Sequence, residues 1–261
     1  MTEFSDDAPG VEPLLRALGG LAAGQVDLRP RIFAHWCEAG GPIGDVFVAF
    51  TDRGACYLRT IESVDGEEAR FAESFRQRFN RPLRLALRPP VGLVSALRRG
   101  RLGKLPVDLR GLTIFEQSVL RATLGIPHGQ IRPYSWIARE IGRPGAMRAV
   151  GSALGHNPVP LLIPCHRVVR TDGDVGGYIF GRHAKEELLT SERVDLAEIR
   201  WLAEHRVFYL GSDTTHIVCF PTCAHARRIT RPHRRGFRSI GQAEQAGYRP
   251  CLSCRPGAMA G

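Results

Sequence analysis

Apolar residues in the first half of the chain follow two patterns, which predict a hairpin and a helix. The runs 45–50 and 55–59 are apolar, and Gly54 lies in the turn between them. Such a pair is typical of two antiparallel strands. Phenylalanines spaced four residues apart predict a helix over 67–78 with one apolar face. We therefore expect strands and a helix to combine in the region 31–110.

Two short helices joined by a turn are predicted further along the chain. Apolar residues recur at helical spacing over 134–141, a Gly/Pro turn follows at 142–144, and a second helix covers about 146–155. This order is typical of a helix-turn-helix, although any hairpin of helices gives the same pattern. The second helix carries small side chains, which would let its backbone lie close to another surface, such as a neighbouring helix.

Two further stretches are amphipathic. The first spans 11–21, and we assign it no function. The second spans 193–204, is polar with a few spaced apolar residues, and predicts a linking helix. We place a domain boundary near 193–205.

The composition is that of a folded protein with more than one domain. A chain of 261 residues is long for one domain, and 43% hydrophobic residues suffice for real cores. The acidic first ten residues lack the apolar core of a signal peptide, so we expect a cytoplasmic protein with no membrane partner. There, the seven cysteines are expected to serve catalysis or metal binding rather than disulfides. Cys37 and Cys56 lack suitably spaced partners and are expected to be free, buried thiols.

The net charge of +10 favours a polyanionic partner, with nucleic acid as the first candidate. The alternative is that the arginine-rich composition reflects genome bias. The charge fits a nucleic-acid partner and genome bias equally well, so only the motifs can indicate the partner.

The strongest chemical motif is IPCHRVV, residues 163–169. A thiol becomes a good nucleophile as the thiolate, and the imidazole of His166 could help Cys165 reach that form. Pro164 fixes its own φ and so restricts the direction of the turn. The apolar flanks suggest a buried setting. Two inert core residues are the plain alternative for a Cys-His pair.

The surroundings of this motif resemble the catalytic domain of the O6-alkylguanine-DNA alkyltransferases. The resemblance runs from Leu112 to Glu192, and the order and intervals of the motifs both fit. The matching stretches are FEQ at 115–117 through IP at 126–127, YSWIA at 134–138, AMRAVG at 146–151, NPVP at 157–160, IPCHRVV at 163–169, GGY at 176–178, and Lys185 with LL at 188–189 and Glu192.

The resemblance implies an α/β (α+β) architecture in parts. A small RNase H-like α/β domain, 1–108, would support a mostly helical alkyltransferase domain, 109–193, that contains the helix-turn-helix. The second helix would enter the minor groove of double-stranded DNA, with Arg148 filling the space of a rotated base. The small residues Ala149 and Gly151 would allow the close approach. We expect a monomer.

The implied reaction is single-turnover transfer of an alkyl group from O6 of guanine to Cys165, with O4-alkylthymine as a further candidate substrate. His166 would draw the thiol proton through a water, and Glu192 would orient the imidazole. Tyr134 would crowd the rotated nucleotide and donate a hydrogen bond to the base. Asn157 would tie the turn together, although it could equally cap a helix.

Further contacts to the base are implied for backbone groups around Val168, Tyr178 and Ile179. Lys185 would favour the thiolate or bond to neighbouring backbone. Surface charge or ordinary packing is the alternative for Tyr134 and Arg148.

The last fifty-odd residues carry a second motif of four cysteines. Three residues separate Cys219 from Cys223, and two separate Cys251 from Cys254. Four thiolates on two short turns are what one tetrahedral Zn²⁺ needs. Eight arginines but one acid, Glu244, lie between Cys219 and Pro256, and such a basic surface suits phosphate contact.

This region, about 206–257, is similar to the Ada-type metal-binding domain. The resemblance implies that Cys219 is a second methyl acceptor, which takes the methyl group of a DNA phosphotriester. Three features depart from the family: Phe220 stands where arginine is usual, the domain comes last in the chain, and no activator segment follows it. A zinc site that only folds the module and grips DNA is therefore the alternative.

Two other functions compete with alkyl transfer. A protein that binds alkylated DNA and signals without chemistry would lack the reactive cysteine, whereas Cys165 is present. A Cys-His hydrolase would need an oxyanion pocket and would give Arg148 no role. O6-benzylguanine separates transfer from hydrolysis, because only the alkyltransferase should lose its thiol to that compound.

Overall fold

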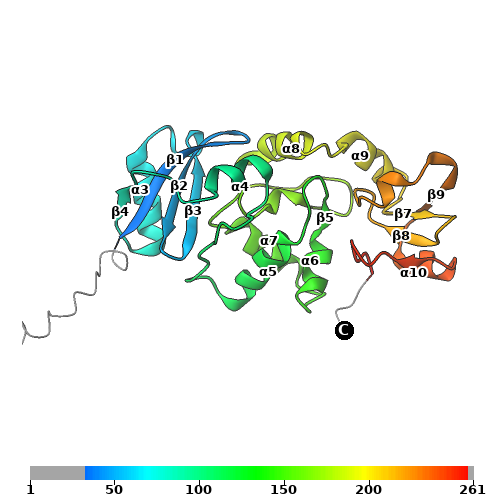
Figure 1. The fold of residues 1–261 in the computed structure, drawn as a ribbon. Coiled ribbons are helices and arrows are strands. Elements are labelled where there is room, and N and C mark those ends of the chain that lie inside the picture. Colours follow the sequence, from blue (N-terminus) through cyan, green and yellow to red (C-terminus); the bar gives the residue numbers. More distant parts are fainter. Residues whose placement is uncertain (1–32, 258–261) are drawn as a thin grey trace, which may run out of the picture.

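The first unit is a four-stranded sheet built by the predicted hairpin and its neighbours (Figure 1). The computed structural model describes residues 33–257, so the amphipathic stretch 11–21 lies outside the described residues. The strand order is β3-β2-β1-β4, with β4 parallel to β1 and the other neighbours antiparallel. The strands are β1 (Ala34–Gly41), β2 (Gly44–Thr51), β3 (Gly54–Thr60) and β4 (Leu83–Leu85).

Alternation along β2 divides the side chains between the two faces of this sheet. Phe47 packs with Phe71 and Phe75 of helix α3 (Glu68–Phe79), which confirms the predicted helix and its apolar face. Val46 and Val48 point to the other face and join the main core. That core also includes helix α4 (Leu93–Arg99) and continues into the second unit.

The second unit is mostly helical and holds the Cys-His motif. Helix α5 begins at a capping box between Thr113 and Glu116. The two helices predicted around the Gly/Pro turn are confirmed as α6 and α7, which pack on α5. A two-stranded parallel pair, β5 and β6, joins the segment before α6 to the last two residues of the motif. The bounds are α5 (Ile114–Leu124), β5 (Arg132–Pro133), α6 (Tyr134–Glu140), α7 (Met147–Gly155), β6 (Val168–Val169) and α8 (Gly181–Ser191).

The predicted linking helix is α9 (Leu196–Glu204), whose first turn is capped by the side chain of Asp195. It leads into a second four-stranded sheet of order β10-β8-β7-β9 at the opposite end of the molecule from the first (Figure 1). Within residues 33–257, no helix has the length and apolar character needed to cross a membrane. The last elements are β7 (Tyr209–Ser212), β8 (Ile217–Cys219), β9 (Arg234–Phe237), α10 (Ile240–Gln245) and β10 (Arg249–Pro250).

Candidate active site and metal centre

Cys165 begins a buried 3₁₀ turn, Cys165–Arg167, that lies against α5 and α8. Asn157 holds this turn, because its Nδ2 donates to the carbonyl of Ile163 at 3.0 Å and to Cys165 Sγ at 3.2 Å. Its Oδ1 accepts the N–H of Val159 at 3.1 Å. The C-cap of α7 is His156, so Asn157 has the tying geometry rather than the capping one.

His166 and Glu192 form a buried pair next to the thiol. His166 Nε2 lies 2.9 Å from Glu192 Oε1, while Nδ1 has no hydrogen-bond partner among residues 33–257. Burial lowers the pKa of His166 despite the carboxylate. Burial raises the pKa of Glu192, but hydrogen bonds from His166 and Arg167 outweigh it and bring that pKa down to about 2. A neutral imidazole held at Nε2 by an ionised carboxylate keeps Nδ1 free to accept a proton.

Arg167 is a site residue that the sequence reasoning missed. Its Nη2 donates to Glu192 Oε1 at 2.7 Å and its Nε to Oε2 at 2.9 Å, with both side chains buried. Gly129 N–H adds a second donor to Oε2 at 2.9 Å. The available signal was a charged residue inside an apolar run, since a buried arginine requires an acidic partner.

The thiol of Cys165 is protonated in its resting environment. Burial raises its pKa, although the hydrogen bond from Asn157 and the charge of Lys185 oppose that effect. Burial also lowers the pKa of Lys185 to about 8. Its Nζ donates to the carbonyls of Val168 at 2.7 Å and Gly177 at 3.2 Å. A thiol in this state needs a base before it can attack.

Cys165 opens onto a cavity of about 290 Å³, close to the volume of an ordinary small-ligand pocket. Burial raises the pKa of Tyr134, so its hydroxyl stays protonated and able to donate into this space. The lining residues are Tyr134, Gly151, Leu154, Gly155, Cys165, Gly177, Tyr178 and Ile179. Val168 does not line this cavity, and its carbonyl accepts a hydrogen bond from Lys185 instead.

A wider groove of about 650 Å³ adjoins this cavity and shares Tyr134 and Gly151 with it. Met147 and Arg148 of α7 line its edge, and Arg148 is exposed. Ala149 is exposed on the same helix but lines neither space. The first turn of α7 is therefore available at the mouth of the pocket.

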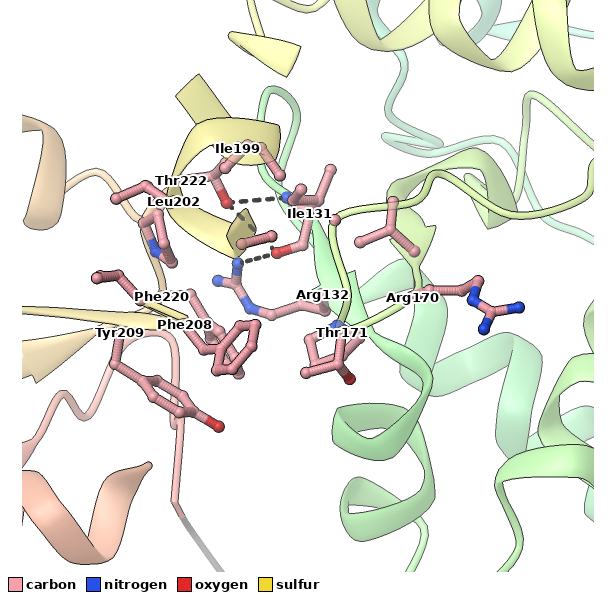
Figure 2. Close-up of a pocket in the computed structure, with 16 residues that line it drawn as sticks. Ile131, Arg132, Arg170, Thr171, Ile199, Leu202, Phe208, Tyr209, Phe220 and Thr222 are labelled. Carbon is pink, nitrogen blue, oxygen red and sulfur yellow. Dashed lines mark hydrogen bonds between the residues drawn. The ribbon is translucent and has the colours of Figure 1, made fainter. Parts of the chain in front are cut away.

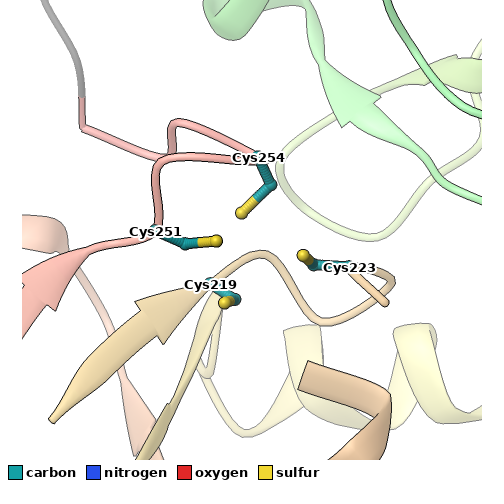
Figure 3. A group of neighbouring side chains, drawn as sticks. All are labelled: Cys219, Cys223, Cys251 and Cys254. Carbon is teal, nitrogen blue, oxygen red and sulfur yellow. The ribbon is translucent and has the colours of Figure 1, made fainter. Parts of the chain in front are cut away.

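The four predicted metal ligands meet at one point (Figure 3). Their sulfur atoms all lie within 4.8 Å of one another, and all four residues are buried. Cys219 ends β8, Cys223 lies in the following loop, and the other two come from the turn after β10. Four thiolates this close would repel one another strongly unless a cation lay between them. A cation that prefers four sulfur ligands in tetrahedral geometry fits this set of donors. The cluster fits one Zn²⁺.

Cys219 also lines a cavity of about 280 Å³ on the zinc-binding unit. Arg228, His225 and His233 lie around the same space, together with hydroxyl groups from Thr214 and neighbouring residues. Cationic and hydroxyl side chains at a cavity lined by a cluster cysteine suit a phosphate group. Phe220, which departs from the family pattern, is buried and packs against Tyr209 with ring centroids 5.4 Å apart.

Cys37 and Cys56 are buried and form no disulfide among the described residues. Burial raises the pKa of Cys37 to about 11 and that of Cys56 to about 12. They have the inert character predicted for them.

Comparison with known proteins adds two family models. Residues 114–194 match the 6-O-methylguanine DNA methyltransferase DNA-binding domain, and residues 202–257 match the metal-binding domain of Ada. A methylated-DNA–protein-cysteine methyltransferase of Shigella flexneri is 40% identical over 114 residues, which are 42% of this chain and 67% of that protein. The chain belongs to the methylated-DNA–protein-cysteine methyltransferase family.

Further matches agree with this family. The regulatory protein Ada of Salmonella typhimurium is 38% identical over 57% of this chain and 42% of its own length. A crystal structure of a Mycobacterium tuberculosis O6-methylguanine methyltransferase variant is 34% identical, with a TM-score of 0.50, over 61% of this chain and 93% of that one. This chain spans 42% to 63% of the length of the first curated relatives that it matches.

Proposed function

We propose that this protein repairs DNA by moving an alkyl group from O6 of guanine to Cys165, once per protein molecule. The observation that carries the proposal is a buried thiol that opens onto a base-sized cavity and has a prepared proton acceptor beside it. The names of its relatives support the same reaction class. O4-alkylthymine is a further candidate substrate.

The chemistry follows from the charges around the thiol. The Cys165 proton passes through a water to His166 Nδ1, and Glu192 stabilises the resulting imidazolium. The sulfur attacks the alkyl carbon, the new S–C bond forms as the O6–C bond breaks, and the electron pair leaves on guanine. Tyr134 donates a hydrogen bond to the departing base. A thioether has no easy leaving path, so the protein is consumed.

The DNA partner is a duplex that carries an alkylated guanine, and the protein works on it as a monomer. Rotation of the base costs about a few kcal/mol, which contacts in the minor groove must offset. Helix α7 supplies these contacts: Arg148 at the edge of the groove fills the vacated stack, and Ala149 and Gly151 let the backbone approach. Backbone groups around Tyr178 and Ile179, which line the cavity, complete the base site.

O6-benzylguanine tests this function. Intact mass of the zinc-loaded protein should rise by one benzyl group, and the adduct should map to Cys165. Cys165→Ser is the matched control and should gain no mass. A catalytic release of product without an adduct would instead support the Cys-His hydrolase and would reject alkyl transfer.

We further propose that Cys219 accepts a methyl group from DNA phosphotriesters. The supporting observation is the cavity that Cys219 lines together with Arg228 and two histidines. The four cysteines would hold one Zn²⁺ as thiolates, and the resulting net charge near −2 would keep the sulfur of Cys219 nucleophilic. Cys223, Cys251 and Cys254 are the remaining ligands. Arg228 holds the phosphate while the methyl group moves and the phosphodiester anion leaves.

The test uses zinc-loaded Cys165→Ser protein and DNA that carries methyl phosphotriesters. A gain of one methyl group at Cys219 supports a second acceptor site. No gain, with zinc and DNA both still bound, would assign this unit to docking and folding alone.

The domain division that we propose is 1–108 for the supporting domain, 109–193 for the alkyltransferase domain and 206–257 for the zinc-binding domain. A cytoplasmic location stays a prediction from the sequence.

A further inference from the structure

The loop around the zinc cysteines is bound to one short segment of the alkyltransferase unit, residues 128–133. Thr222 Oγ1 accepts the N–H of Ile131 at 3.0 Å and donates to the carbonyl of the same residue at 3.3 Å (Figure 2). Arg227, four residues after Cys223, donates to the carbonyl of Gly129. Both sides of the segment's backbone are therefore held by the loop that carries two cluster cysteines.

The other contacts of the same segment reach the catalytic groups. Gly129 N–H donates to Glu192 Oε2 at 2.9 Å, and that carboxylate orients His166. β5 pairs with β6, which directly follows the Cys165 turn. Tyr134, the first residue of α6, immediately follows β5. Segment 128–133 thus lies between the zinc loop and the residues that position the thiol's base and the alkylated base.

The second cysteine turn is bound to helix α6. Trp136 Nε1 donates to the carbonyl of Cys254 at 3.1 Å, and Arg139 donates to the carbonyl of Pro256 at 3.0 Å. Arg255 forms an ion pair with Glu140 of the same helix. Both turns of the cluster therefore contact the alkyltransferase unit, and their relative position depends on the bound cation.

The buried charge of Arg132 also favours a metal-bound cluster beside segment 128–133. Its side chain is 2% exposed, and its hydrogen bonds reach only the Ile131 carbonyl and Gln130 Oε1, while Nε has no partner among the described residues. Its guanidinium lies 5.0 Å from the ring centroid of Phe220. A buried cation needs a counter-charge, and the four neighbouring cysteines provide one as thiolates on Zn²⁺.

Figure 2 shows the crevice between the alkyltransferase unit and the zinc-binding unit. Its volume is about 60 Å³, far below the roughly 300 Å³ at which ligand pockets begin. It has no room for a nucleobase. The contact between the two units is thus a packed joint, and its function has to come from what it holds in place.

We propose that the zinc loop is a positioning element of the alkyltransferase site: Thr222 and Arg227 hold segment 128–133, and through it Glu192 and Tyr134, only when the four thiols bind their cation. This inference rests on the proposed alkyl transfer to Cys165. Zinc loading then sets the reactivity of a thiol that does not bind zinc. Thr222, Arg227 and Arg132 are positioning residues.

Amide hydrogen exchange tests the joint without any reaction. Stripping zinc with a chelator should speed exchange at the Gly129 and Ile131 amides by roughly tenfold or more, because their acceptors lose their support. Amides of β2, in the first sheet, are the internal control and should not change. Unchanged exchange at Gly129 and Ile131 would overturn the proposal.

A matched pair of variants tests the effect on reactivity. Thr222→Val keeps the shape but removes the hydroxyl, whereas Thr222→Ser keeps the hydroxyl. At saturating O6-benzylguanine, Cys165 of Thr222→Val should be alkylated roughly threefold to tenfold more slowly. That factor corresponds to the net free energy of one hydrogen bond. Thr222→Ser should match wild type, and both variants should still bind one zinc. Zinc-stripped wild type should be slower than Thr222→Val.

Equal maximal rates for wild type, Thr222→Val and zinc-stripped protein would reject the positioning role, whatever the exchange data show. Failure of the underlying function is distinguishable from this result. If zinc-loaded wild type forms no adduct at all, alkyl transfer is wrong, and hydrogen exchange alone then decides whether the joint depends on zinc.

Discussion

The two cysteine sites reach reactivity from opposite starting points. Cys165 is a single buried thiol whose pKa burial raises, and it has a neutral imidazole with a free Nδ1 nearby. Cys219 is as deeply buried but lies among three other sulfurs within 4.8 Å. The first site has too little positive charge to hold a thiolate, and the second would have far too much negative charge without a cation.

The difference shows that burial alone does not decide what a cysteine can do. Under the proposed alkyl transfer, the proton acceptor beside Cys165 acts only once the substrate is in place, so the thiol would stay protected between encounters. At the cluster, a divalent cation would hold four thiolates permanently. Cys37 and Cys56 have neither device, and they are the inert reference within the same chain.

Removing one cluster ligand should break this comparison most severely. Cys254→Ala leaves three thiols, so zinc affinity should fall by more than roughly 100-fold, beyond what changes outside the ligand set cause. Competition with a colorimetric chelator measures the affinity. Cys37→Ala, which changes an equally buried cysteine outside the cluster, should bind zinc like wild type. Equal affinities for the two variants would exclude the four-thiol site.

Replacing the carboxylate at the first site should have the next largest effect. Glu192→Gln can still accept a hydrogen bond from His166 but cannot stabilise the imidazolium, so alkylation of Cys165 should slow by roughly 10²-fold. Single-turnover kinetics with O6-benzylguanine give the rate. Glu187→Gln, an exposed change on the same helix, is the control. An unaltered rate in Glu192→Gln would remove the carboxylate from the relay.

Acid should weaken the first site through the same carboxylate. Hydrogen bonds to Glu192 overcome burial and depress its folded-state pKa from 4.5 to about 2. A depressed pKa contributes stability above the unfolded-state value, and that stability is lost as pH falls from about 4.5 towards 2. Wild type should lose on the order of 3 kcal/mol over this window that Glu192→Gln does not lose. Denaturant unfolding at several pH values measures both, and parallel curves would contradict the depressed pKa.

Replacing Arg148 should have the smallest effect, and it separates base rotation in duplex DNA from alkyl transfer to Cys165. Arg148 lines the groove but makes no contact with Cys165, so Arg148→Ala should slow repair in duplex DNA roughly tenfold while reaction with free O6-benzylguanine stays unchanged. Arg53→Ala removes the same charge from an exposed turn in the first unit. Equal losses in both assays would remove Arg148 from base rotation.

Much of the local structure could be predicted because it depends on local spacing. The phenylalanine spacing gave α3, and the Gly/Pro turn separated α6 from α7, each within about one residue of its observed ends. The sheet order could not be predicted, since β4 joins β1 from more than forty residues away. The residues by themselves gave Cys165 and His166 as a pair, whereas Glu192 came only from the family resemblance.

The sequence by itself determined the reactive groups: a Cys-His turn between apolar runs, two cysteine pairs with metal-ligand spacing, and a helix-turn-helix with an arginine on its second helix. These features depend on neighbours within a few positions. The tertiary structure decided which distant charges meet, because such pairing depends on how separate elements pack. It paired Arg167 with Glu192 and buried Phe220 beside Arg132. It also bound the zinc loop to the segment that contacts the Glu192 carboxylate, through contacts that span 91 residues of chain between Ile131 and Thr222.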